Sequence, residues 1–145
     1  MEQKLYDTVT DCPVIAAIKD DAGLERCLDS DIQIVFVLYG DIVSIPEIVD
    51  RIKKKGKLAM VHADLISGLA GKEIAIDFLK RNTQADGIIS TKLSFIKRAK
   101  ELGMATVFRF FVIDSMAFDN IQKQYEAACP DFVEILPGIM PKIIA

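Results

Sequence analysis

The residues best suited to chemistry in this chain lie within or just after short apolar runs. The only histidine, His62, follows the run 58–61 (LAMV), and Asp64 comes two residues later. Residues two apart in an extended strand point to the same side. We therefore expect His62 and Asp64 to face one way, where an imidazole and a carboxylate can transfer protons or bind a polar ligand.

Two other apolar runs each contain one charged residue in the middle. Arg109 lies within the run 107–111 (VFRFF), and Glu134 lies within 131–136 (DFVEIL). If these runs are neighbouring strands, the two side chains can pair across one strand spacing. Two interpretations stay open, a buried structural ion pair or a ligand site in which both residues converge with His62 and Asp64. The convergence of four such groups favours the ligand site.

A third candidate is Ser90-Thr91-Lys92, which follows another apolar run and precedes a predicted helix. Two hydroxyl groups, free backbone N–H groups and a lysine can together bind an anion. An ordinary helix N-cap with an exposed lysine explains the same residues equally well.

The one dense basic run is 51–57 (RIKKKGK), which contains Lys53, Lys54 and Lys55. Cations at the end of a helix complement its dipole, so a solvated helix end is one interpretation. A patch for RNA or another partner is the alternative, and it must be local because the formal net charge is −3.

Alternating apolar and amphipathic segments must position these residues. The predicted strands are 12–18, 32–39, 57–62, 86–90, 104–113 and 131–136. The predicted helices are 20–29, 44–55, 71–81, 92–102 and 115–128. The second helix begins with Ser44-Ile45-Pro46-Glu47, which resembles a capping box with proline in the first turn.

Strands that are apolar on both faces, each followed by a helix, indicate a parallel sheet covered by helices. Six such units fit an α/β, TIM-barrel-like (β/α) parallel barrel, with six βα units of the eight. A doubly wound open sheet is the alternative, but no GxGxxG follows the first strand. We expect a single domain over 1–145 whose natural form continues for about two more units. A charge in the middle of a barrel strand then points inward, towards the polar mouth.

The composition limits the class of protein. The chain is 51% apolar and its mean hydropathy is +0.28, which supplies a core and leaves no room for long disorder. The three widely spaced cysteines indicate reduced thiols rather than disulfides or a zinc site. No apolar run is long enough to span a membrane, and the polar N-terminus is unlike a signal peptide. We expect a cytoplasmic protein with no metal and no cofactor.

Four segments carry a family resemblance: 60–69 (MVHADLISGL), 85–103 (ADGIISTKLSFIKRAKELG), 109–118 (RFFVIDSMAF) and 130–144 (PDFVEILPGIMPKII). They are similar to the glycerol-3-phosphate-responsive antiterminator family of bacterial glycerol-uptake regulators, in the same order and over almost the entire chain. The resemblance implies a TIM-barrel-like fold, binding of glycerol 3-phosphate, and action on the leader mRNA of a glycerol operon. It implies a regulator rather than an enzyme, and it leaves the oligomeric state open, a homo-oligomer included.

The resemblance also implies a ligand role for residues in the matching segments. These residues are His62, Asp64, Ser90, Thr91, Lys92, Arg109, Glu134 and Gly138. Members of the family continue past 136–138 (LPG) with two more strands, and barrels usually bind phosphate in the loops after those strands. His62 and Asp64 are then expected to form the polyol half of the site.

A phosphate-binding barrel enzyme is the second hypothesis. Pentulose-phosphate epimerases and decarboxylases also place His and Asp at strand ends, and 61–65 (VHADL) is similar to theirs. In such an enzyme Asp64 would be the general base and His62 its partner or an electrophile.

Overall fold

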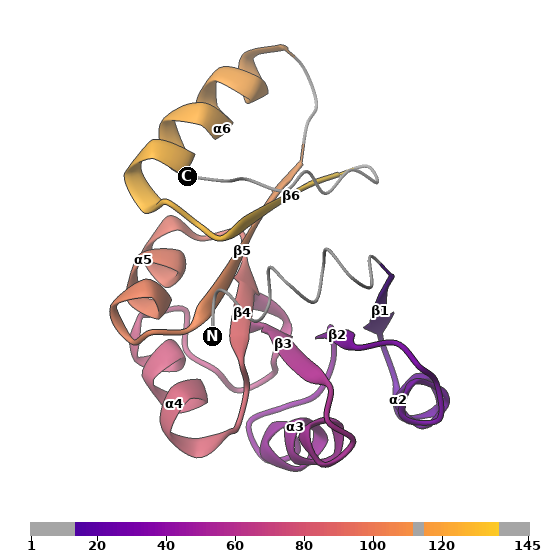
Figure 1. Cartoon of the computed structure of the whole chain (residues 1–145). Helices are drawn as coiled ribbons and strands as arrows, with labels where there is room; N and C mark the ends of the chain where they lie inside the picture. Colours follow the sequence, from indigo (N-terminus) through magenta and orange to yellow (C-terminus); the bar gives the residue numbers. More distant parts are fainter. Residues whose placement is uncertain (1–13, 112–114, 137–145) are drawn as a thin grey trace.

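The computed structural model describes residues 14–111 and 115–136. The described residues form one parallel sheet in which each strand pairs with the next in the chain (Figure 1). The strands are β1 (Ile15–Ile18), β2 (Ile34–Val37), β3 (Leu58–His62), β4 (Gly87–Ser90), β5 (Ala105–Phe111) and β6 (Phe132–Leu136). Helices follow the strands: α2 (Asp21–Leu28), α3 (Ile45–Lys54), α4 (Ile74–Asn82), α5 (Leu93–Glu101) and α6 (Ser115–Ala128).

The sheet curls, and α2 to α5 cover its outer side (Figure 1). The strand order β1-β2-β3-β4-β5-β6 never reverses, whereas a doubly wound sheet reverses its order at a switch point. The prediction of a partial TIM-barrel-like fold is therefore confirmed, and the doubly wound alternative is wrong. None of the helices in 14–111 and 115–136 is long and apolar enough to cross a membrane.

Two apolar cores explain why the strands are apolar on both faces. The outer core joins the sheet to the helices, for example through Val61 and Phe108 of the strands and Phe95 of α5. The inner core lines the concave side, and its members are Ile34, Phe36, Leu58, Met60, Ile89, Ala105, Val107 and Phe132. Because side chains alternate along a strand, His62, Arg109 and Glu134 belong to the inner face.

The register of the strands sets the height of these polar residues. His62 aligns with Ile89, Ile89 with Val107, and Val107 with Phe132. Arg109 and Glu134 align with each other two residues further along β5 and β6. His62 thus ends β3 at the level of the last layer of the inner core, and Arg109 and Glu134 lie one inward-facing layer further towards the carboxyl ends, on the side of the barrel mouth.

The start of α3 differs from the predicted capping box. The Ser44 side chain makes no capping hydrogen bond to the helix. Instead, Asp41 Oδ1 accepts hydrogen bonds from the backbone N–H groups of Val43 (2.9 Å) and Ser44 (2.7 Å). The capping-box prediction is therefore wrong, because Ser44 Oγ accepts a hydrogen bond from the backbone N–H of Asp41 (3.0 Å), in the turn before the helix, rather than from α3.

Candidate functional site

The inner face of the sheet ends in a cluster of His62, Arg109 and Glu134. Arg109 Nε and Glu134 Oε1 form an ion pair, with side chains 16% and 13% exposed. His62, at the end of β3, is 3% exposed. The predicted pairing of Arg109 with Glu134 is confirmed, and it arises because β5 and β6 are neighbours in register.

The His62 imidazole is held neutral by its surroundings. Burial lowers the pKa of His62, and the positive charge of Arg109 lowers it further, against the opposing charges of Asp64 and Glu134. Its Nδ1 atom is buried and has no hydrogen-bond partner among the residues that the structure describes. A buried ring nitrogen of this kind is suited to a hydrogen bond from a bound molecule.

Asp64 does not continue the strand that His62 ends. It lies in η1 (Ala63–Leu65), a short 3₁₀ helix, so the expected alternation of an extended strand stops at His62. Its Oδ1 accepts a hydrogen bond from Ser90 Oγ (2.7 Å), and its Oδ2 accepts from the backbone N–H (2.9 Å) and Oγ1 (2.7 Å) of Thr91. The strand alternation on which the prediction for His62 and Asp64 rested therefore ends at His62, although the two side chains still interact electrostatically.

The charge on Asp64 is stabilised by this turn. Burial raises the pKa of the carboxyl group, but the hydrogen bonds from Ser90 and Thr91 outweigh burial and hold the pKa below its usual value. Asp64 is thus an ionised anchor for the turn between β4 and α5.

Ser90, Thr91 and Lys92 form that turn in different ways. Ser90 is fully buried, and its hydroxyl donates to Asp64 and accepts from the backbone N–H of Lys92 (3.0 Å). Lys92 is exposed, and its Nζ lies 4.7 Å from the centre of the Phe95 ring. Lys92 itself is the N-cap of α5 and makes no side-chain capping bond, so the plain N-cap interpretation is wrong for Ser90 and Thr91. Gly138 lies outside the described residues.

The basic run lies at the opposite rim, where α3 ends and β3 begins. Lys53 Nζ binds both carboxylate oxygens of Asp86, at 3.0 and 2.8 Å, and Asp86 is 5% exposed. Lys54 is 75% exposed and pairs with Asp50 one turn earlier. Lys53 is therefore part of a structural ion pair, which leaves Lys54 and Lys55 as the exposed cations among the three predicted residues.

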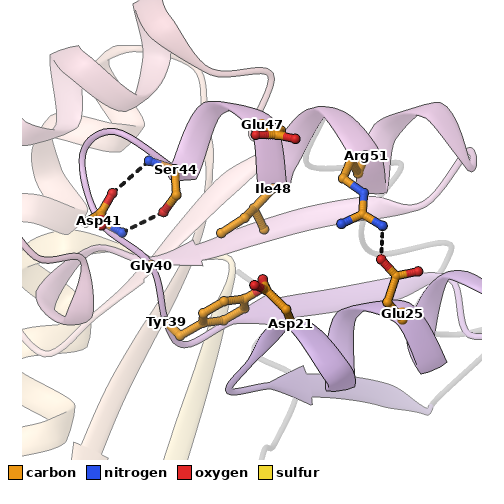
Figure 2. Close-up of a pocket in the computed structure, with 9 residues that line it drawn as sticks. All are labelled: Asp21, Glu25, Tyr39, Gly40, Asp41, Ser44, Glu47, Ile48 and Arg51. Atoms are coloured by element: carbon orange, nitrogen blue, oxygen red, sulfur yellow. Dashed lines mark hydrogen bonds and ion pairs between the residues drawn. The ribbon is translucent and has the colours of Figure 1, made fainter.

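A hollow of about 480 Å³ between α2 and α3 was not predicted (Figure 2). It is lined by Asp21, Glu25, Tyr39, Gly40, Asp41, Ser44, Glu47, Ile48 and Arg51. Ion pairing of Arg51 with Glu25 and a 2.7 Å hydrogen bond from Tyr39 Oη to Asp21 Oδ1 join its walls. In the sequence, the segment Tyr39-Gly40-Asp41 marks the loop after β2 that lines this hollow. No group of three metal-ligating side chains occurs within the described ranges.

A curled parallel sheet that alternates with helices, with a buried polar cluster towards the carboxyl ends of its strands, defines a TIM-barrel-like α/β protein. Comparison with known families identifies which one. The pattern of the glycerol-3-phosphate responsive antiterminator family matches residues 14–145, and the chain belongs to this family.

Solved structures agree with this assignment. The glycerol uptake operon antiterminator regulatory protein of Listeria monocytogenes is 34% identical with a TM-score of 0.82, over 86% of this chain and 68% of that one. A glycerol uptake operon antiterminator-related protein of Thermotoga maritima is 36% identical with a TM-score of 0.77, over 86% and 70%. The Escherichia coli (strain K12) protein YgcP, which is uncharacterized, is 51% identical over 132 residues, which are 91% of this chain and 69% of YgcP.

Membership of the family decides between the two hypotheses drawn from the sequence. The family consists of regulatory antiterminators rather than enzymes, so the predicted regulator is confirmed. The epimerase-like or decarboxylase-like alternative is wrong for this chain, and His62 and Asp64 are not an acid–base pair of a catalytic site.

Proposed function

We propose that this protein is a glycerol 3-phosphate-responsive transcription antiterminator of a glycerol uptake operon, which binds the leader mRNA when the ligand is bound. The match to the antiterminator family over 14–145 carries the proposal. The related structures are a glycerol uptake operon antiterminator regulatory protein and a glycerol uptake operon antiterminator-related protein, which supports the same target. A protein that acts on nascent mRNA works in the cytoplasm.

The proposed ligand site is the mouth at the carboxyl ends of β3 to β6. His62, Arg109 and Glu134 are proposed to contact the polyol, and Lys92 the anionic end. Asp64, Ser90 and Thr91 hold the turn that carries Lys92, because their side chains are already bonded to one another within it. Gly138 stays a predicted ligand residue.

The proposed mechanism is a shift between two populations. A ligand that binds one state of the barrel more tightly raises the fraction of that state. RNA that binds the same state then binds the protein more tightly, and bound RNA raises the affinity for the ligand by the same factor. The exposed Lys54 and Lys55 are the proposed RNA contacts. A homo-oligomer would present this basic surface more than once and so raise the avidity for RNA, although each copy also adds a net charge of −3.

Transcription through the leader of the operon tests the function directly. The purified full chain should raise read-through of the leader terminator when glycerol 3-phosphate is present, and should have little effect with glycerol or inorganic phosphate. Arg109→Gln should require a higher concentration of ligand for the same read-through. Read-through that does not depend on glycerol 3-phosphate would contradict the proposal.

A further inference from the structure

The His62 side chain is buried without a full set of hydrogen bonds. It is 3% exposed, and its Nδ1 atom has no hydrogen-bond partner within 14–111 and 115–136. A buried polar group left without a hydrogen bond costs about 1–3 kcal/mol. A molecule that binds at the mouth and pairs with Nδ1 recovers this cost.

The charged groups that act on the ring already have bonding partners. Arg109 and Glu134 are paired with each other, and Asp64 is bonded to the β4–α5 turn. Arg109 lowers the pKa of His62, whereas Asp64 and Glu134 raise it, so all three act on the ring electrostatically. Among the described residues at the carboxyl end of β3, the buried polar atom left without a hydrogen bond is thus the imidazole Nδ1.

The chemistry of a neutral imidazole limits what can pair with it. Nδ1 either donates or accepts, depending on the tautomer. A hydroxyl group satisfies both cases because it can donate and accept, whereas a carboxylate only accepts and adds a negative charge beside Glu134. A methylene group does neither. Burial and the charge of Arg109 lower the pKa of His62, which keeps the ring in the neutral form that this pairing needs.

We propose that His62 determines ligand specificity by hydrogen bonding through Nδ1 to a hydroxyl group of the ligand. The site then takes the phosphate ester of a polyol, and it rejects phosphate esters with a carboxylate or a methylene at the same position. This inference rests on the proposed function, because it assigns one recognition contact within the proposed ligand site.

Calorimetric titration of the full chain at pH 8 tests the contact. The ligands are glycerol 3-phosphate, 3-hydroxypropyl phosphate and 2-hydroxypropyl phosphate, which each lack one hydroxyl, and 3-phosphoglycerate. In the wild type, one of the two deoxy compounds should bind about 10–100-fold more weakly than glycerol 3-phosphate. If that compound is 2-hydroxypropyl phosphate, the contacted hydroxyl is the terminal one, and 3-phosphoglycerate, whose carboxylate replaces it, should also bind weakly. In His62→Leu, glycerol 3-phosphate and that deoxy compound should bind alike. His62→Gln keeps a donor and an acceptor and should restore part of the preference.

Nitrogen NMR supplies a readout that needs no variant. His62 is the only histidine, so the imidazole signals are assigned without ambiguity. Saturating glycerol 3-phosphate should shift the Nδ1 resonance, and the weakly bound deoxy compound at saturation should shift it much less. This measurement also applies if His62→Leu does not fold.

Three outcomes count against these ideas in different ways. If the wild type and His62→Leu discriminate between the ligands to the same extent, the specificity role of His62 is wrong but the proposed function is not contradicted. An Nδ1 resonance that does not move at saturation has the same meaning. No binding of glycerol 3-phosphate by the wild type contradicts the proposed function, and the specificity role falls with it.

Discussion

At the scale of single residues, His62 and Asp64 take different partners although they are two positions apart. The chain leaves the strand at His62 and turns into a 3₁₀ helix, so the Asp64 carboxylate reaches Ser90 and Thr91. The imidazole stays with Arg109 and Glu134 on the inner face. One residue of the pair is therefore suited to contact a ligand, and the other fixes a turn.

Asp64→Asn should destabilise the protein in a way that depends on pH. The amide replaces one acceptor with a donor that faces the Ser90 or Thr91 donors, which costs about 1–3 kcal/mol at pH 7. The pKa of Asp64 is lowered on folding, so its ionised form stabilises the fold above the unfolded pKa of about 3.9. This stabilisation is lost as the pH falls through the folded pKa. Urea unfolding should give the same difference in the free energy of unfolding between the wild type and Asp64→Asn at pH 7 and pH 5, and a smaller difference at pH 3.5.

Asp29→Asn is a suitable control because Asp29 is exposed at the end of α2. It should change the free energy of unfolding by less than about 0.5 kcal/mol. If Asp64→Asn has no larger effect than Asp29→Asn at pH 7, the anchoring role of Asp64 is wrong.

The pair of Arg109 and Glu134 needs a test that separates stability from binding. Arg109→Met and Glu134→Leu should each destabilise the fold, by up to about 3 kcal/mol, because each leaves the other charge half-buried and unpaired. The double variant should recover much of the stability, since it leaves no unpaired charge.

Affinity for glycerol 3-phosphate should behave differently in the same variants. If the pair contacts the ligand, the double variant stays about 10-fold or more weaker than the wild type by calorimetry even though it is folded. A double variant with wild-type affinity would show that the pair is purely structural.

At the scale of elements, two aspartates tie helices to strands at the rim opposite the mouth. Asp86, just before β4, binds Lys53 of α3 and the backbone N–H of Ala59 in β3, the last at 2.8 Å. Asp131, just before β6, likewise binds Lys100 of α5 and the backbone N–H of Thr106 in β5 (2.8 Å). Each aspartate thus joins one helix and two neighbouring strands.

Asp86→Ala should cost about 3 kcal/mol or more in urea unfolding, because it leaves a buried backbone N–H without an acceptor and removes a largely buried ion pair. Lys54→Met is the matched control on the same helix. Lys54 is 75% exposed and its pair with Asp50 should contribute at most about 0.5 kcal/mol. Similar costs for the two variants would contradict the role of Asp86 in joining α3 to the sheet.

Between β3, β4 and β5 a glycine permits close packing. A Cβ atom on Gly87 would lie 2.2 Å from the carbonyl oxygen of Ala105 and 2.7 Å from Met60 Cε. The backbone of β5 cannot move away without breaking its pairing, so a larger residue is excluded here. This contact keeps the inner core continuous beneath the mouth.

At the scale of the whole molecule, the proposed ligand and RNA sites lie at opposite rims of the sheet. Lys54→Glu with Lys55→Glu should weaken binding of the leader RNA and reduce the slope of affinity against salt concentration by about 2. Lys53 is left unchanged because a glutamate there would face Asp86. The measurement is a filter-binding titration at several salt concentrations with glycerol 3-phosphate present.

Lys97→Glu serves as the control because Lys97 is an exposed cation of α5 outside the run. It should lower the affinity much less than the double variant. The same affinity and salt slope in the double variant and the wild type would remove Lys54 and Lys55 from the RNA site.

The sequence by itself determined the sheet and the pairing within it. Runs such as 32–39 are apolar throughout, and a strand with that pattern must be covered on both faces, which only helices on a parallel sheet provide. Arg109 and Glu134 each interrupt such a run, so their pairing followed once β5 and β6 were neighbours. The family segments were also visible in the chain, and the match over 14–145 confirmed them.

Only the tertiary structure decided which polar residues are bonded within the fold and which one is left to contact a ligand. Asp64 and Ser90 are 26 positions apart, and their hydrogen bond depends on where β3 ends and how β4 turns into α5, which hydrophobic periodicity does not specify. The partner of Lys53 is likewise 33 positions away. Local patterns fix which residues are buried, whereas long-range contacts fix which buried group lacks a hydrogen-bond partner. In the described part of the chain that group is the Nδ1 atom of His62.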